Sequence, residues 1–308
     1  PHDTPWQQEQ FQRRYQELHT IGKGRTAVIK QAQDRGTGQA VALKVVDRRR
    51  IPQRVIRAEY NFLTALSHCG ILRGLAMFEN APSPGVDTIV MELLQGMDVL
   101  SHACSLSSIS EAHVRRVATQ LLSALDYLQL QQIVHCDIKP DNLLIENHNG
   151  QFQLKIVDFG SACSLSAGAV SCQPCLPPDL EFAAPELLSG PSTSPSLATD
   201  MWSCAVLIYV LVSGVSPFLD ESPEETTAHV LNADFSFPPD LFPPGSAETQ
   251  EFISSLLVLD STSRPLARSA LSHTWLQLDK SNYDVPPTLL ASFVSRRKPQ
   301  LITQSFVL

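Results

Sequence analysis

Apolar and polar positions alternate through much of the first third of the chain, and this pattern predicts β-strands. Successive side chains of a strand point to opposite faces, so a half-buried strand carries an apolar residue at every second position. One segment, 53–67, differs because its apolar residues recur at helical spacing, which predicts a helix. Strands are expected from Tyr15 onward, around 28–30, and over 40–46, 71–78 and 87–92.

Beyond Gly96 the apolar residues recur mainly at helical spacing. Segment 110–130 carries one apolar stripe and is predicted to be a long amphipathic helix. Short strands are expected at 143–145 and 154–157, and further helices at 197–213, 223–232, 247–258 and 267–276.

The break in the β pattern at 93–96 predicts a hinge between two lobes, and the fold class is α+β. The small lobe is rich in strands and has one main helix, whereas the larger lobe is mainly helical. The expected divisions are an N-terminal linker or short leading helix at 1–14, the small lobe at 15–94, the large lobe at 95–276 and a C-terminal tail at 277–308.

Composition and charge exclude several classes of protein. The 308 residues are 43% apolar and 18% charged, which is typical of a globular chain and not of a disordered one. The formal charge of −8 argues against non-specific binding of nucleic acid. The longest apolar run, Met201 to Val212, is too short to span a bilayer and predicts a buried helix. We therefore expect neither nucleic acid nor a membrane among the partners.

The seven cysteines are scattered and odd in number, which favours a reducing, cytoplasmic location over a disulfide framework. Cys172 and Cys175 form a single C-x-x-C pair without a second pair of ligands, so two free thiols are favoured over a zinc site. The chain begins at Pro1 and not at a methionine, which suggests a piece of a longer protein.

The densest chemistry lies in the segment His135-Cys-Asp-Ile-Lys-Pro-Asp-Asn142. Pro140 disfavours the helical conformation of the preceding residue, so a rigid loop is expected that directs Asp137, Lys139 and Asn142 into one space. Asp158 follows in an Asp-Phe-Gly turn. A carboxylate, a cation and a carboxamide beside a second carboxylate suit phosphate and metal chemistry.

Two further charged residues lie where burial is expected. Lys44 lies inside an apolar strand, where a cation is costly unless it is paired or exposed. Glu59 falls on the apolar face of the predicted 53–67 helix, so each of the two explains the burial of the other. The glycines of Gly22-Lys23-Gly24 permit close approach to phosphate, but a plain hairpin would explain them about as well.

Taken together, these motifs resemble those of eukaryotic protein kinases over residues 15–276. Lys139, two residues after the expected catalytic aspartate, resembles the serine/threonine class. Segments 181–186, 213–222 and 234–238 resemble the kinase domains of Trio, kalirin and obscurin, within the calmodulin-kinase-like group. The resemblance implies the bilobal kinase fold and transfer of phosphate from ATP to protein hydroxyls.

The resemblance also implies individual roles. Asp137 would orient the attacking hydroxyl and accept its proton, and Lys139 would offset charge on the γ-phosphate. Lys44, paired with Glu59, would neutralise the α- and β-phosphates. Mg²⁺ would be bound by Asp158 and Asn142. The rest of the ATP site would comprise Ile21, Gly22, Lys23, Gly24, Val28, Ala42, Met91, Glu92, Leu94 and Leu144, with Asp98 reaching the ribose or a basic substrate.

Other residues are expected to support the structure. Glu186 and Arg264 would form a buried ion pair, and Asp200 would anchor the backbone of the catalytic loop. The side chains of four residues would stack as an apolar column through both lobes, namely Leu63, Leu75, His135 and Phe159.

Three positions depart from the kinase pattern, and they keep an alternative open. Ala27 replaces the third glycine of the loop, Cys136 replaces the usual arginine, and Asp179 stands where threonine is common. No phosphate or metal ligand is lost, so an active kinase is favoured over a kinase-fold binding module or weakly active pseudokinase in a large scaffold. Without the arginine, the 161–182 loop should not need a phosphate for its ordering.

The tail carries an apolar stripe, Leu289, Leu290 and Phe293, followed by the basic residues 296–298. One interpretation is that the stripe packs on the large lobe. The other is that the tail occupies the substrate cleft, where Asp98 and Asp141 would attract basic segments. A protein substrate, with basic motifs, is the other expected partner.

Overall fold

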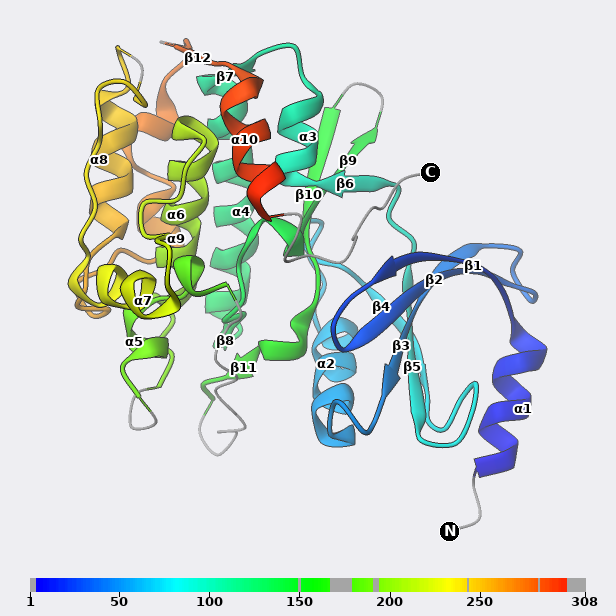
Figure 1. Ribbon diagram of the computed structural model, residues 1–308. Helices are drawn as coiled ribbons and strands as arrows, with labels where there is room; N and C mark the ends of the chain where they lie inside the picture. The colour runs from blue at the N-terminus through cyan, green and yellow to red at the C-terminus, as the bar shows by residue number, and fades with distance from the viewer. Residues whose placement is uncertain are drawn as a thin grey trace.

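The computed structural model describes residues 4–148, 151–166, 179–190, 194–242, 244–281 and 283–297. Its two lobes meet at the segment between Glu92 and Gly96, and Figure 1 shows the strand-rich lobe beside the larger helical one. This arrangement confirms the α+β bilobal fold. Among the described residues, no helix is long and apolar enough to cross a membrane.

The small lobe is built on one antiparallel sheet with the strand order β1-β2-β3-β5-β4. Helix α2, Gln53–Ala65, packs on β4 and β5 and also reaches the large lobe at η2, Phe159–Ser161. The strands are β1 Tyr15–Lys23, β2 Ala27–Asp34, β3 Ala40–Asp47, β4 Gly74–Phe78 and β5 Val86–Glu92.

Strand β4 begins three residues later than the pattern predicts. The backbone of 70–72 bonds instead to the large lobe, because Leu72 N donates to Ile156 O and Ile156 N donates to Gly70 O. Alternation alone does not reveal which neighbour a strand-like segment will pair with. This pairing ties the two lobes together behind the segment that joins them.

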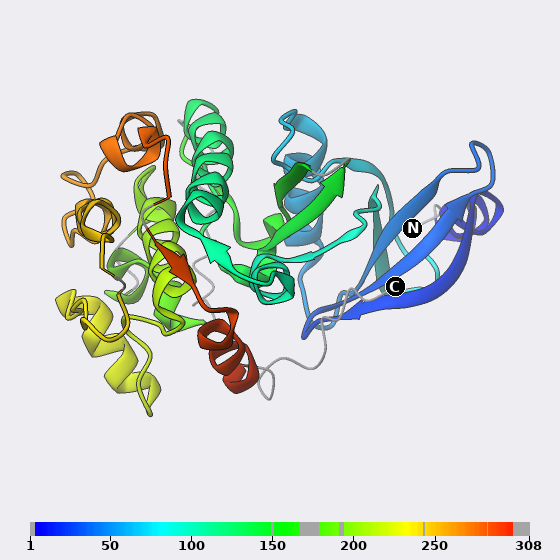
Figure 2. The ribbon, with the colours of Figure 1, turned by 90° about the horizontal axis from the view of Figure 1, so that it is seen from above.

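The N-terminal residues 4–14 form helix α1, Thr4–Arg14, at the end of the small lobe away from the large lobe (Figures 1 and 2). Phe11 is buried, and its ring lies 5.8 Å from that of Tyr15 and 5.5 Å from that of Phe78. Helix α1 therefore packs on the small lobe through an aromatic cluster of Phe11, Tyr15 and Phe78.

The large lobe surrounds two long helices, α4 Glu111–Leu130 and α6 Thr199–Ser213. Ser110 caps α4, because its side chain accepts a hydrogen bond from His113 N at 3.2 Å. Every residue of α6 is buried, so the apolar run at 201–212 is a core helix as expected. Around them lie α3 Val99–Ser105, α5 Pro185–Leu188, α7 Pro223–Asn232, α8 Ala247–Leu256 and α9 Ala267–Ala270.

The helix expected over 267–276 is divided in two. Helix α9 ends at Ala270, and the 3₁₀ helix η4, Thr274–Gln277, follows it. His273 separates them, because its side chain accepts a hydrogen bond from Trp275 N and thereby starts a new helical segment.

Short strands and 3₁₀ turns connect these helices. Strands β6, β9 and β10 make a three-stranded sheet, whereas β8 pairs with β11. The elements are β6 Gly96–Asp98, β7 Ile109–Ser110, β8 Ile133–Val134, η1 Pro140–Asn142, β9 Leu143–His148, β10 Gln151–Ile156, β11 Cys163–Ser164 and η3 Leu180–Phe182.

The described part of the tail packs on the large lobe. Strand β12, Asp284–Val285, pairs with β7, and helix α10, Pro287–Arg297, lies against α3 and α6 (Figures 1 and 2). Leu290 and Phe293 are buried, as the packing interpretation expects. Lys298 and the rest of the tail lie outside the described residues.

The expectation that the cysteines are unpaired holds only in part. Cys69, Cys136 and Cys204 are free thiols, whereas Cys163 is disulfide-bonded. The pair Cys172 and Cys175 lies outside the described residues.

Candidate active site

The loop 135–142, which is expected to be catalytic, follows β8, and hydrogen bonds to its backbone fix its position. Asp200, at the start of α6, accepts hydrogen bonds from His135 N at 2.7 Å and Cys136 N at 2.9 Å. Cys136 has a left-handed backbone, with φ of 63°, which is uncommon for a residue with a side chain. The anchoring role expected for Asp200 is confirmed.

The chemistry of the loop converges on Asp137. Asn142 Nδ2 donates to Asp137 Oδ2 at 2.8 Å and to its backbone oxygen at 2.9 Å. Lys139 Nζ lies 3.0 Å from Asp137 Oδ2. Because η1 begins at Pro140, the chain turns tightly after Lys139 and brings Asn142 back to Asp137.

Lys139 has a second carboxylate partner that sequence reasoning missed. Asp179 Oδ2, just before η3, lies 2.9 Å from Lys139 Nζ. The substitution of threonine by aspartate at this position was visible in the sequence, but its contact with Lys139 was not. The ammonium therefore lies between two carboxylates.

Asp158 lies opposite this loop and faces Lys44. Lys44 Nζ lies 2.8 Å from Asp158 Oδ1 and 2.6 Å from Glu59 Oε1. Lys44 comes from β3, Glu59 from α2 and Asp158 from the turn before η2, so one cation connects three elements. The expected Lys44–Glu59 pair is present, and Asp158 completes it.

Burial and charge set the protonation of these groups. Burial raises the pKa of Asp137 to about 6, although the nearby Lys139 ammonium opposes this shift. Loss of contact with water would by itself raise the pKa of Asp158. The positive charge and the hydrogen bond of Lys44 together outweigh this effect, and the pKa of Asp158 falls to about 2. Burial by itself would lower the pKa of Lys44, yet Asp158 and Glu59 raise it. At neutral pH the site therefore combines ionised carboxylates with two charged lysines.

An open cavity lies between the lobes beside these residues. Ten of the expected site residues line it, namely Ile21, Ala42, Lys44, Glu59, Met91, Glu92, Leu94, Asn142, Leu144 and Asp158. The cavity is also lined by Ile29, Leu72, Leu93, Asp141 and Val157.

The expectation for Val28 is corrected. Its neighbour Ile29 lines the cavity, whereas Val28 is not among the lining residues. Successive side chains of a strand point to opposite faces, so an error of one position in β2 exchanges the inward residue for the outward one.

Four other residues expected in the ATP site lie outside the lining of the cavity, as do the expected catalytic residues Asp137 and Lys139. Gly22, Lys23 and Gly24 lie at the turn from β1 to β2, where Gly24 N donates to Ala27 O at 2.9 Å. Asp98 caps α3, because its Oδ1 accepts hydrogen bonds from Leu100 N at 3.0 Å and Ser101 N at 2.9 Å. The cap gives Asp98 a structural role at the start of that helix.

The apolar column is present in part. The rings of His135 and Phe159 are 4.9 Å apart, and Leu63 is fully buried. Leu75 is 39% exposed, so it does not belong to the column. The residue of β4 that meets Leu63 is Gly74, where an added Cβ would lie 2.9 Å from Leu63 Cβ.

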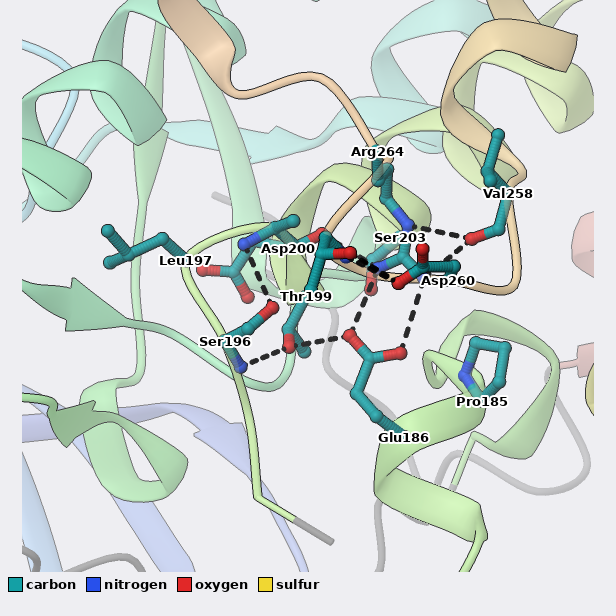
Figure 3. A network of polar contacts seen from close by, with 12 residues as sticks. Pro185, Glu186, Ser196, Leu197, Thr199, Asp200, Ser203, Val258, Asp260 and Arg264 are labelled. Atoms are coloured by element: carbon teal, nitrogen blue, oxygen red, sulfur yellow. Dashed lines mark hydrogen bonds and ion pairs between the residues drawn. The ribbon is translucent and has the colours of Figure 1, made fainter.

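The expected ion pair of Glu186 and Arg264 is confirmed and lies in a network of polar contacts (Figure 3). Arg264 Nη1 lies 3.0 Å from Glu186 Oε1, and Thr199 Oγ1 donates to the same oxygen at 2.8 Å. Since Thr199 precedes Asp200, the network connects α5 to the helix that anchors the catalytic loop.

Cys136 occupies a different environment from an arginine that receives a phosphate. Its Sγ lies 3.5 Å from Cys163 Sγ, and Cys163 pairs with Val134 across β11 and β8. Burial strongly raises the pKa of the Cys136 thiol. Backbone pairing therefore attaches 163–164 to β8, the strand that leads into the loop 135–142.

The comparisons with known proteins agree with this geometry. The sequence matches the protein kinase domain family over residues 15–276. Death-associated protein kinase dapk-1 of Caenorhabditis elegans is 31% identical, over 91% of this chain but only 19% of that protein. Myosin light chain kinase A of Dictyostelium discoideum is 28% identical, over 92% of this chain and 95% of that protein. Mouse calcium/calmodulin-dependent protein kinase type IV is 30% identical, over 93% of this chain and 60% of that protein.

Two solved structures share the fold. The autoinhibited serine kinase domain of the giant muscle protein titin gives a TM-score of 0.82 at 24% identity, covering 96% of this chain and 92% of that one. The twitchin kinase region from Caenorhabditis elegans gives 0.83 at 25% identity, covering 94% of this chain and 51% of that one. The chain therefore belongs to the protein kinase family, and it is a serine/threonine kinase domain of the calmodulin-kinase-like type.

Proposed function

We propose that this domain transfers the γ-phosphate of ATP, with Mg²⁺, to serine and threonine hydroxyls of protein substrates through the residues described above. The observation that carries the assignment is the position of Lys44, bonded at once to Glu59 and Asp158 at the edge of the cavity. A cation fixed by two carboxylates from different lobes is pre-organised to receive phosphate oxygens.

The adenine part of the nucleotide binds in the apolar part of the cavity. Ile21 and Ala42 contact it from the small lobe and Leu144 from the large lobe, with Met91 at the back. The N–H of Glu92 donates to Arg73 O at 3.0 Å, so the carbonyl of Glu92 is the group that serves the nucleotide, together with the backbone of Leu94. Gly22, Lys23 and Gly24 cover the phosphates from the turn between β1 and β2.

The side chains available for Mg²⁺ fit its chemistry. Asn142 uses its Nδ2 to bind Asp137, which leaves its Oδ1 as an oxygen ligand, and the side chain of Asp158 is 47% exposed. Among the described residues, no group of three His, Cys, Asp or Glu side chains is placed to bind a metal ion. Mg²⁺ commonly takes one or two protein ligands beside substrate phosphates, and when bound it neutralises their developing charge.

Asp137 orients the acceptor hydroxyl and takes its proton, and Asn142 and Lys139 fix the direction of its carboxylate. Lys139 meets the transferred phosphate. Little covalent work remains for the protein, so positioning and electrostatics supply most of the rate enhancement.

The substrate and the regulation are finer parts of this proposal. The net charge of −8 and Asp141 at the cavity favour substrates with basic residues near the acceptor. The enzyme acts in the cytoplasm. Strand β12 and helix α10 pack on the large lobe, so an internal inhibitor would come from the tail residues beyond 297.

Transfer of labelled phosphate from ATP to a basic peptide tests the proposal. The wild-type chain should show magnesium-dependent transfer. Asp137→Asn should still bind nucleotide but lose about a thousandfold in kcat, and Asp158→Ala should lose magnesium-dependent turnover. Nucleotide binding without transfer in the wild type would instead support the binding-module alternative, and full transfer in Asp137→Asn would refute the role proposed for Asp137.

A further inference from the structure

Asp179 and Asp137 bind the same ammonium group. Asp179 Oδ2 lies 2.9 Å from Lys139 Nζ, and Asp137 Oδ2 lies 3.0 Å from it. The exposed fractions of the Lys139, Asp137 and Asp179 side chains are only 11%, 15% and 18%, so water screens these charges weakly. With both carboxylates ionised, the cluster carries one more negative than positive charge.

The structure around Asp179 fixes this contact. Phe182 N donates to Asp179 O at 3.1 Å, which closes the turn into η3. The carbonyl of Phe182 in turn accepts a hydrogen bond from Ser203 Oγ of α6 at 2.7 Å, and Phe182 is buried. Asp179 is therefore presented to Lys139 from a segment attached to the core of the large lobe.

Under the proposed function, Lys139 is the cation that meets the transferred phosphate. A phosphate that approaches Lys139 must share the ammonium with two carboxylates already in contact with it. Like charges brought together at a poorly solvated site repel strongly, whereas a neutral side chain at 179 would leave one carboxylate and one ammonium in balance. Lys44 is bonded elsewhere, to Glu59 and Asp158, so the remainder of the nucleotide meets a different cation.

We propose that Asp179 is an electrostatic restraint on Lys139, which weakens the interaction of the enzyme with the γ-phosphate and thereby slows phosphoryl transfer. This inference rests on the proposed function. It assigns to Asp179 a positioning role that acts through Lys139, and it makes the restraint part of the folded domain itself.

Nucleotide affinity tests the restraint without turnover. Calorimetric titration with Mg²⁺ should compare ADP with a non-hydrolysable ATP analogue, because the two ligands differ by the γ-phosphate. Asp179→Asn removes the charge but keeps an oxygen that accepts from Lys139. This variant should bind the ATP analogue about five- to tenfold more tightly relative to ADP, with little change in its affinity for ADP itself.

Steady-state kinetics give a second readout. Asp179→Asn should lower the KM for ATP about five- to tenfold, in line with the tighter analogue, and should raise kcat about two- to threefold, so that kcat/KM for ATP rises about tenfold or more. Asp179→Glu keeps the charge and should not raise kcat. Asp126→Asn is the matched control, since Asp126 is similarly buried, at 20% exposed, and pairs with Arg268 away from the site. It should change neither quantity.

Each remaining outcome is decisive. A lower kcat and a weaker ATP analogue in a folded Asp179→Asn protein would show that Asp179 assists Lys139, and unchanged values would show that it has no effect on the phosphate. Asp179→Thr supplies a second neutral variant if the first does not fold. Absence of transfer in the wild type and in every variant would refute the proposed function, and the nucleotide titrations would then decide the restraint alone.

Discussion

Glu59 and Lys44 form a buried ion pair between α2 and β3, with 2.6 Å between Oε1 and Nζ. The two side chains are only 5% and 10% exposed. Because α2 also contacts η2, the position of this helix decides whether Lys44 reaches Asp158. The pair thus connects the packing of α2 to the position of the Lys44 ammonium group.

Removing the charge of Glu59 should damage the use of ATP. Glu59→Gln removes the charge of one of the two carboxylates that hold Lys44, so the lysine is held less firmly in position, and kcat/KM for ATP should fall by about ten- to a hundredfold. Glu17→Gln is the control, because Glu17 pairs with Lys30 on neighbouring strands outside the cavity lining. Equal ATP dependence in wild type and Glu59→Gln would contradict the role of this pair.

The stability of the large lobe should depend on pH through His113. Burial, with the nearby His102 and Arg116, lowers the pKa of His113 to about 4, so the folded state favours the neutral ring. The stabilisation is full above the unfolded pKa of about 6.5 and is lost as pH falls from there toward 4. Urea unfolding should show a loss of up to about 1.4 kcal/mol per pH unit in this window.

His113→Gln should flatten this dependence, although it also removes the stacking of His113 on His102. The slope with pH, and not the absolute stability, is therefore the quantity to compare. His19→Gln, at an exposed position, serves as the control. Parallel slopes for wild type and His113→Gln between pH 6.5 and about 4 would rule out this origin of the acid sensitivity.

Breaking the Glu186–Arg264 pair should destabilise the domain. The Arg264 side chain is fully buried, so Glu186→Gln leaves an uncompensated guanidinium, although Ala198 O and Val258 O still accept from it. A loss of about 3 kcal/mol in the free energy of unfolding is expected. Asp126→Asn, which breaks a pair with the exposed Arg268, should cost less than about 1 kcal/mol. A similar loss of unfolding free energy in both variants would show that the buried pair contributes no more to stability than the exposed pair.

Helix α10 should contribute to stability through two side chains. Leu290→Ala and Phe293→Ala each leave a cavity against the large lobe, and each should cost about 2–5 kcal/mol by chemical denaturation. A chain that ends at residue 297 keeps this packing, so the effect of 298–308 on activity can be measured separately from it. Higher kcat/KM for a basic peptide in that shortened chain would assign inhibition to 298–308. Losses below about 1 kcal/mol in both alanine variants would show that these two side chains contribute little to the stability of the domain.

The sequence predicted which side chains lie together where short, stiff motifs carry them. Asp137, Lys139 and Asn142 are close in the chain, so a single turn at Pro140 brings them together. Lys44 and Glu59 were paired by the argument that an isolated buried charge is costly, and the structure has that pair. The two lobes followed from the change of apolar period.

The errors came from relationships that local pattern does not encode. Val28 was expected where Ile29 lies, because a register error of one residue is invisible to alternation. Leu75 was expected in the column, but the irregular register between Gly74 and Ala76 in β4 turns it outward. The contact of Asp179 with Lys139 depends on how η3 packs on α6, which is a tertiary effect.

The aromatic cluster of Phe11, Tyr15 and Phe78 also bears on where this domain can be cut. The match to the kinase family begins at residue 15, but a polypeptide started there would lack the helix that covers Tyr15 and Phe78. Both rings would then be exposed to water at the surface of the sheet. Exposed apolar patches of this kind promote self-association. Expression in soluble, monomeric form therefore calls for boundaries that retain Thr4 to Arg14, upstream of the residue at which the family match begins.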